Sequence, residues 1–143
     1  MNSFKKFLYE QEDMYPLALK EIKNGKKVSH WIWFIFPQIR GLGTSEISEY
    51  FAINDVKEAK DYLNNEILGP RLIEITSELL KINDKSIEDI LGYVDSLKLQ
   101  SCMTLFQLAD PSNRLFQDVL DKYFFGEKDE KTIEICKQFE LER

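Results

Sequence analysis

Six consecutive apolar residues, Trp31 to Phe36, end abruptly at Pro37, and this run limits the possible folds more than any other feature of the chain. Residues 30–36 hold the only histidine, both tryptophans and two of the ten phenylalanines. The length of the run fits a buried strand or a buried helical turn. Because no hairpin dipeptide separates alternating runs elsewhere, partner strands are lacking, and we expect a helix that breaks at Phe36, before Pro37.

Helix start and stop signals recur along the rest of the chain. The apolar stripe that begins at Phe4 is expected to stop near Pro16, where a second helix takes over. Pro70 is expected at the first position of a longer helix. Four capping signals are predicted from side chains that can accept a backbone hydrogen bond: Thr44 or Ser45, Asp55 with Glu58, Ser86 with Asp89, and Asp129.

The helix over residues 97–109 is the most buried candidate. Asp95 or Ser96 is expected to open it, and its apolar side chains cover nearly every face, which is typical of a helix in the middle of a bundle. The sequence therefore predicts an all-α fold, a compact bundle of about eight or nine short helices, with residues 1–143 as one domain.

Composition narrows the class of protein. The chain is 43% hydrophobic and 31% charged, as in soluble globular proteins, and has no 18-residue apolar run and no secretory signal, so we expect a cytoplasmic protein without a membrane partner. The single histidine and two separated cysteines, Cys102 and Cys136, do not form the usual zinc site, and buried free thiols are expected. No metal or other cofactor is implied.

The charge is unevenly distributed. The net charge of −6 argues against binding to duplex nucleic acid. Residues 1–45 nevertheless hold seven Lys/Arg against four Asp/Glu, a balance of +3, whereas residues 46–143 have a balance of −9. The basic part coincides with the aromatic segment, which favours a small anionic ligand there; ordinary solvated lysines are the alternative.

The loop after Pro37 contains the strongest candidate ligand residues. Gln38 and Arg40 lie at the edge of the apolar run, and Gly41 and Gly43 allow a ligand to approach the backbone. An arginine beside free backbone N–H groups suits a phosphate or a carboxylate. The loop lacks the spacing of a P-loop or a dinucleotide fingerprint, and the alternative is a tight turn in which Arg40 pairs with a carboxylate of the fold.

His30 and the tryptophans form a second group of candidates. His30 is the weak candidate for an acid or base, although a lone histidine there is more often a cap or a core partner. Trp33 or Trp31 could stack on a base or sugar, although tryptophans in a domain of this size usually belong to the core.

Lys98, Ser101 and Thr104 follow one another at intervals of three on the otherwise apolar helix. Polar groups in such a helix need partners. They are expected to bond to neighbouring helices, or else to line an internal cleft. In that cleft Lys98 would be an anion ligand facing Arg40, and Ser101 is a further ligand candidate.

Three motifs identify a family resemblance: the segment HWIWFIFPQIRGLG, the later ILGPRL (Ile67 to Leu72), and DSLKLQSCMTLF (Asp95 to Phe106). Together they resemble the bacterial family of domain of unknown function 1810, some members of which are mislabelled calpastatin. The resemblance extends from Phe4 to about Ile135. It implies a compact all-helical fold, and it implies no activity and no catalytic residues.

Two functions follow from the sequence. The first is binding of a small anionic, nucleotide- or phosphate-like ligand between the His30–Ser45 segment and the helix 97–109. The second is a helical protein–protein interaction module without catalytic activity, its protein partner unknown. A cleft in which Arg40 and His30 are open to solvent would favour the first, and a large exposed apolar patch elsewhere would favour the second.

Overall fold

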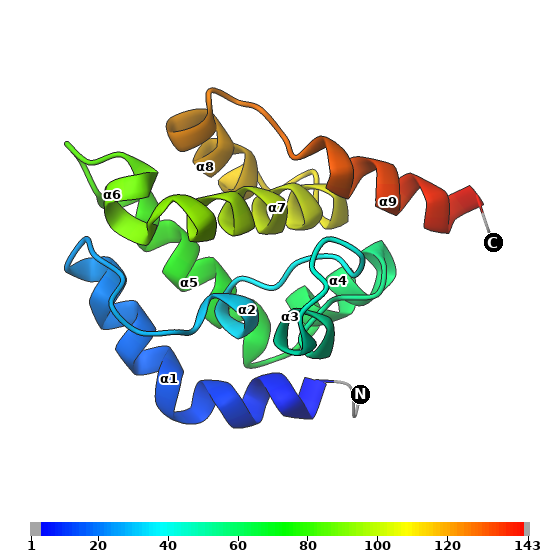
Figure 1. The fold of residues 1–143 in the computed structure, drawn as a ribbon, viewed down its shortest axis with the longest axis horizontal. Helices are drawn as coiled ribbons and strands as arrows, with labels where there is room; N and C mark the ends of the chain where they lie inside the picture. The colour runs from blue at the N-terminus through cyan, green and yellow to red at the C-terminus, as the bar shows by residue number, and fades with distance from the viewer. Residues whose placement is uncertain (1–3, 142–143) are drawn as a thin grey trace.

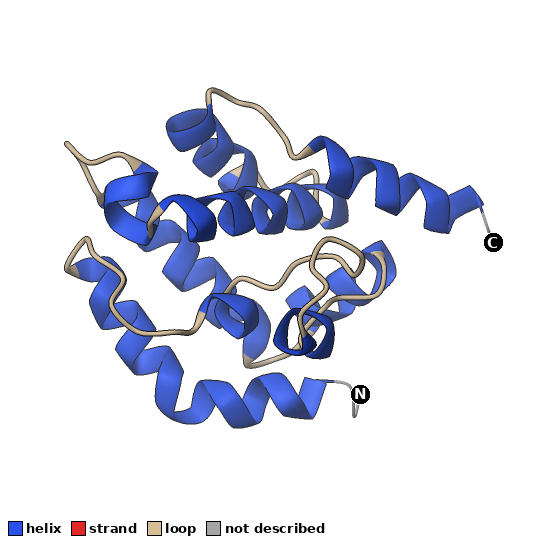
Figure 2. Cartoon of the chain, viewed as in Figure 1, coloured by secondary structure: helices blue, strands red, loops and turns tan. Residues whose placement is uncertain are grey.

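The computed structural model describes residues 4–141, which form nine helices and no strand (Figures 1 and 2). The helices are α1 (Lys5–Lys23), α2 (Ile32–Ile35), α3 (Glu46–Tyr50), α4 (Val56–Asn64), α5 (Leu68–Lys81), α6 (Ile87–Leu91), α7 (Tyr93–Ala109), α8 (Leu115–Phe124) and α9 (Glu130–Leu141). The predicted all-α bundle is therefore confirmed. Over this described range, no helix is long and apolar enough to cross a membrane.

Two helices organise the packing. α7 lies across the middle of the molecule (Figure 1) and packs against α2, α4, α6, α8 and α9. α5 packs against α1, α4 and α8. From Leu99 to Phe106 α7 is buried on nearly every side, as its composition predicts, but its first turns leave Tyr93, Val94 and Leu97 exposed.

Stacked aromatic rings connect four helices through the core. Phe7 of α1 packs edge-on against Tyr62 of α4, with ring centroids 5.3 Å apart. Tyr62 lies 5.5 Å from Phe106 of α7, which lies 5.9 Å from Phe116 of α8. Tilted and edge-on contacts of this kind add to the free energy gained by burying the rings.

The apolar run folds as the short helix α2, which ends before Pro37 as predicted. Ile32, Phe34, Ile35 and Phe36 are all buried. Beyond Pro37 the chain is extended, and Ile39 forms an isolated parallel bridge with Ile53. This bridge joins the loop after α2 to the loop before α4.

The predicted caps are present in the structure. Ser86 and Asp89 form a full capping box at α6. The Oδ1 atom of Asp55 accepts from the N–H of Glu58 at 2.8 Å. Asp129 and Ser45 accept from the N–H groups of Thr132 and Ser48 at the starts of α9 and α3, so Ser45 rather than Thr44 is the cap.

The predicted helix break at Pro16 is wrong. α1 continues through Pro16 as one helix and bends about midway (Figure 1). Proline removes a backbone hydrogen bond and bends a helix, but it does not end one that is held by packing on both sides. Phe7 before Pro16 and Ile22 after it are both buried, and α1 packs against α5.

The predicted start of α7 at Asp95 or Ser96 is also wrong. The helix starts at Tyr93, and the Ser96 hydroxyl donates to the carbonyl of Tyr93 instead of capping. Asp95 forms an ion pair with Lys27, far away in sequence. A capping residue is recognised by a local pattern, and here a long-range partner takes its carboxylate.

The start of α5 differs from the prediction in a smaller way. Pro70 occupies the third position and not the first, because α5 begins at Leu68. Asn65 supplies the missing cap, since its Oδ1 accepts from the N–H groups of Ile67 and Leu68, each at 3.0 Å.

Candidate functional site

The segment before α2 is fixed by the carboxylate of Glu21, which is buried on α1. Its Oε1 accepts from the N–H groups of Val28 and Ser29 and from Nε1 of Trp31, at 2.9, 3.0 and 2.9 Å, and its Oε2 accepts from the Ser29 hydroxyl at 2.7 Å. Burial alone would raise the pKa of Glu21, but the donors from Ser29, Val28 and Trp31 outweigh it and lower the pKa to about 2. Trp31 is fully buried by this arrangement and has no free face for a ligand.

A partly buried ion pair joins the same segment to α7. The Nζ of Lys27 lies 2.8 Å from Oδ2 of Asp95 and 5.0 Å from the ring centroid of Trp31. The side chain of Lys27 is only 8% exposed. The pair therefore sets the position of the segment that leads into α2 relative to the first turns of α7.

His30 and Trp33 lie at the border of this anchored segment. The His30 side chain is exposed, and it has no hydrogen bond or ion pair within residues 4–141. Trp33 is half-buried and packs against the core. A histidine acting as an acid or base is usually oriented by a partner, so the geometry gives His30 no support of this kind.

Arg40 is positioned by backbone pairing. The N–H of Ile53 donates to the carbonyl of Gln38 at 2.8 Å, and the N–H of Arg40 donates to the carbonyl of Ile53 at 2.7 Å. This places Arg40 beside Asn54, whose Oδ1 accepts from the guanidinium Nε at 2.6 Å. The half-buried side chain of Gln38 has no hydrogen-bond partner within the described range.

Asn54 is held in turn by the first turn of α4. Glu58 accepts from the Asn54 N–H at 2.9 Å and from Nδ2 at 3.2 Å. The backbone N–H and the side-chain Nδ2 of Asn54 both donate to Glu58, and this orients the Asn54 Oδ1 toward the Arg40 guanidinium. Glu58 therefore orients Arg40 through Asn54 and forms no ion pair with it.

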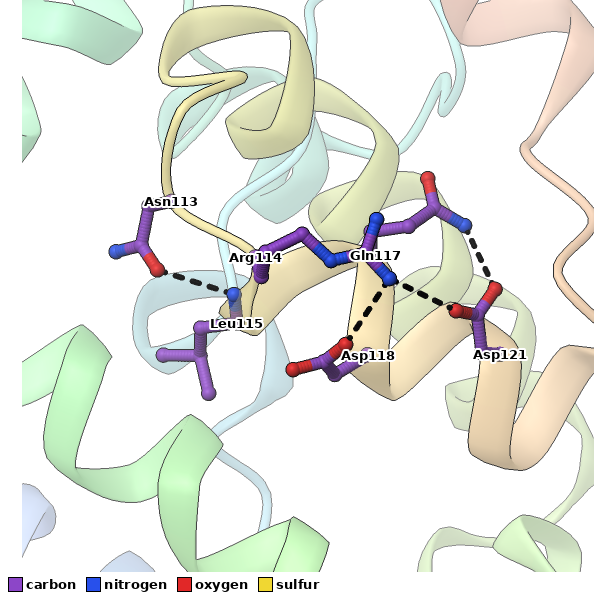
Figure 3. A network of polar contacts seen from close by, with 6 residues as sticks. All are labelled: Asn113, Arg114, Leu115, Gln117, Asp118 and Asp121. Carbon is purple, nitrogen blue, oxygen red and sulfur yellow. Dashed lines mark hydrogen bonds and ion pairs between the residues drawn. The ribbon is translucent and has the colours of Figure 1, made fainter.

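Arg114, in contrast to Arg40, forms ion pairs within the same molecule. Its guanidinium lies 3.3 Å from a carboxylate oxygen of Asp118 and 3.4 Å from one of Asp121 (Figure 3). Arg40 has no carboxylate within 4 Å in the part of the chain that the structure describes. The alternative, in which Arg40 is bound by a carboxylate of the fold, therefore does not hold for these residues.

A second cation lies in the same corner. Lys6 of α1 has its Nζ 5.0 Å from the ring centroid of Tyr50 and 5.8 Å from that of Phe7. Partial burial lowers the pKa of Lys6, and the nearby charge of Arg40 lowers it further while Glu58 acts in the opposite direction. We call Lys6, Arg40, Tyr50, Asn54 and Glu58 the basic corner.

Sequence reasoning did not select Lys6, Tyr50 or Asn54. The net charge of +3 over residues 1–45 was the available signal for Lys6. Nothing local points to Tyr50 or Asn54, since they reach Arg40 only through the pairing of residues 38–40 with Ile53.

The backbone geometry of the loop explains why glycine stands at positions 41 and 43. Gly41 has a φ of +106°, which side chains rarely adopt, and a Cβ there would lie 3.3 Å from Cδ1 of Ile135 on α9. A Cβ at Gly43 would lie 2.5 Å from the Ser48 hydroxyl. Both glycines are therefore required by the turn itself, whether or not a ligand approaches it.

The polar stripe of α7 is mostly used within the fold. Ser101 donates to the carbonyl of Leu97 and to Oδ2 of Asp129, each at 3.2 Å. Thr104 accepts from the N–H of Asp129 at 2.9 Å. These bonds fix the start of α9 against α7, which is the structural role expected for polar groups in an apolar helix.

Lys98 differs from these neighbours. It is half-buried and has no hydrogen bond or ion pair within residues 4–141. α2 and α7 are in contact, so the two elements of the predicted site are adjacent. No hydrogen bond or ion pair of the described residues joins Arg40 to Lys98 or to Ser101, and the two groups have separate neighbours.

The cysteines and acidic groups add no further site. Cys102 and Cys136 are both buried, as predicted, and form no disulfide with each other, and burial raises the pKa of the Cys102 thiol. Among the described residues, no group of three or more His, Cys, Asp or Glu side chains could hold a metal ion.

Fold and site together define a compact, all-helical protein with an oriented arginine in a basic corner beside its central helices. A family model described as "Protein of unknown function (DUF1810)" matches residues 1–136, and the chain belongs to this family. The chain is also similar to the conserved hypothetical protein Rv1873 from Mycobacterium tuberculosis, whose crystal structure is known at 1.38 Å. The two are 41% identical with a TM-score of 0.92, over 94% of this chain and 96% of that one. No curated protein sequence matches the chain.

Proposed function

We propose that this protein binds a small anionic ligand at the His30–Ser45 segment, with Arg40 as the main ligand residue. The observation that carries the proposal is that the Arg40 guanidinium is oriented by a neutral side chain and has no carboxylate partner among the described residues. Asn54 fixes it through Nε at 2.6 Å, and no carboxylate of the described residues neutralises it. An arginine oriented in this way presents its two terminal nitrogens as a fork for two oxygens of a phosphate or carboxylate.

The charges of the basic corner support an anion. Lys6 and Arg40 contribute two positive charges, and Glu58 offsets one of them while its oxygens accept from Asn54. An anion that approaches Arg40 would also relieve the repulsion between the two cations.

The remaining predicted residues belong to the same proposal. Gly41 and Gly43 shape the loop, and the unpaired side chains of Gln38 and Trp33 border it. On α7, Lys98 has no hydrogen bond or ion pair among the described residues, and Ser101 lies one turn further on. His30 is the candidate acid or base if the ligand is also a substrate.

Thermal unfolding in the presence of inorganic phosphate and small dicarboxylates tests the proposal. A ligand that binds only the folded state raises Tm, and at a concentration of 100 Kd it adds about 2.7 kcal/mol to the free energy of unfolding. We expect a Tm increase for wild type that Arg40→Ala removes and that Lys98→Ala weakens.

Arg114→Ala is the matched control, because it removes an exposed arginine whose partners are Asp118 and Asp121. It should keep the full response to ligand. If no anion raises Tm, or if Arg40→Ala responds like wild type, the proposal is refuted.

A protein–protein interaction module is the second candidate, and a specific surface favours it. Val28, Tyr93, Val94 and Leu97 are all exposed, and the Lys27–Asp95 pair holds Val28 beside the first turns of α7. Clustered exposed apolar side chains are typical of contact surfaces. A protein retained by the wild-type chain but not by Leu97→Asp, together with no response to anions, would favour this function over the first.

A further inference from the structure

The basic corner contains an exposed aromatic ring that the core does not require. Tyr50, the last residue of α3, is 58% exposed. Its ring packs edge-on against Phe51, with centroids 4.9 Å apart at 78°. Phe51 is buried between Phe7 and Phe34, whose ring centroids lie 5.5 and 5.3 Å away. The Tyr50 ring therefore stands on a rigid base while most of its surface remains open.

One cation, Lys6, lies next to this ring, and Arg40 is connected to the segment that follows it. The Nζ of Lys6 is 5.0 Å from the centroid of Tyr50. Arg40 pairs through its backbone with Ile53, three residues beyond Tyr50, and through its side chain with Asn54. Tyr50 therefore precedes by four residues Asn54, whose side chain fixes the Arg40 guanidinium.

We infer that the basic corner takes a phosphate carried on an aromatic group, in the manner of a nucleoside monophosphate: Tyr50 stacks on the base, and Arg40 with Lys6 holds the phosphate. This inference rests on the proposed anion site and adds the substrate class. Every nucleic-acid base is planar and has a π-face that can stack on an exposed aromatic side chain. The flat guanidinium of Arg40 suits the phosphate.

The tryptophans do not supply this stacking surface. Trp31 is fully buried, and its indole N–H is taken by Glu21. Trp33 packs against the core and is only partly accessible. The Tyr50 ring, by contrast, is exposed and has the Lys6 ammonium at its side.

Isothermal titration of the full chain with three probes tests the inference: adenosine monophosphate, ribose 5-phosphate and inorganic phosphate. Stacking on one aromatic side chain gives roughly a tenfold gain in affinity. Adenosine monophosphate should therefore bind roughly tenfold more tightly than ribose 5-phosphate. Tyr50→Ala should remove this preference and leave the affinity for ribose 5-phosphate unchanged, whereas Tyr50→Phe should keep the preference.

Two controls separate the site from general effects. Tyr93→Ala removes another exposed tyrosine, on α7, and should keep the preference. Arg40→Ala should weaken binding of all three probes. Equal affinities for adenosine monophosphate and ribose 5-phosphate, or a preference that survives in Tyr50→Ala, would overturn the inference and leave the anion site standing. If none of the three probes binds, the inference fails, and the anion site then stands only if a dicarboxylate raises Tm.

Discussion

Glu21 is expected to be the most important single charge for the stability of this fold, and the substitution Glu21→Gln tests it. The carboxylate accepts four hydrogen bonds, from Val28, Ser29 and Trp31, and so anchors the chain just before α2. Glutamine has nearly the same shape, but it is neutral and replaces one acceptor oxygen by a donor group. The variant should fold with a loosened segment between α1 and α2.

The size of the effect follows from the pKa of Glu21. The pKa falls from its usual 4.5 to about 2 in the folded protein. Each unit corresponds to 1.36 kcal/mol, so the charge contributes roughly 3 kcal/mol, and screening by water around the exposed residue Val28 reduces this to about 2 kcal/mol. Glu21→Gln should lower Tm by about 4–8 °C at pH 7.

The pH dependence gives the stricter test. Because the folded-state pKa of Glu21 is lower than the unfolded one, its contribution is fully present above about pH 4.5 and is lost as pH falls toward 2. Urea unfolding at several pH values should therefore show a difference between wild type and Glu21→Gln that is large at pH 6 and falls to about a quarter of that size at pH 2.5.

Glu12→Gln serves as the control, since Glu12 lies on the same helix, is exposed and has no hydrogen bond within the described residues. It should change stability little at any pH. A Glu21→Gln difference that stays constant between pH 6 and 2.5, or one below about 0.5 kcal/mol at pH 7, would refute the reasoning.

Two backbone predictions complete the set. Phe125 follows α8 with a φ of 56° and a side chain that is 95% exposed, so Phe125→Gly relieves a left-handed conformation without losing burial. After the greater freedom of glycine in the unfolded chain is subtracted, urea unfolding should show a gain of about 0.5–1 kcal/mol, and a loss would contradict this. Gly69→Ala acts in the opposite direction, because its Cβ would lie 2.0 Å from the carbonyl oxygen of Leu63. That clash is with backbone and cannot be relieved by a rotamer change, so we expect a loss of about 3 kcal/mol or more. A circular-dichroism melt with the Tm of wild type would rule this out.

Features coded by neighbouring residues were predictable from the sequence. The caps at Ser45, Asp55, Ser86 and Asp129 are found where the sequence places them, because each depends on a side chain reaching a backbone N–H about three residues ahead. The end of α2 before Pro37 depends on a clash between adjacent residues and is equally local.

Features that depend on distant partners were not predictable. Helix α1 runs through Pro16 because side chains of both halves, such as Phe7 and Ile22, are buried in the core. Asp95 does not cap α7 because Lys27, sixty-eight positions earlier in the numbering, takes its carboxylate at 2.8 Å. A local pattern carries no information about such competition.

The same division holds for the candidate site. The sequence by itself determined the helical class, the caps, the burial of the apolar run and the choice of Arg40, since these follow from periodicity, turn chemistry and the meeting of an apolar segment with a basic loop. Only the tertiary structure decided that Trp31 is enclosed and that Lys6 lies close to both Arg40 and Tyr50. The physical reason is the pairing of residues 38–40 with Ile53 and the packing of Phe7 on Phe51, contacts between segments that are distant in sequence.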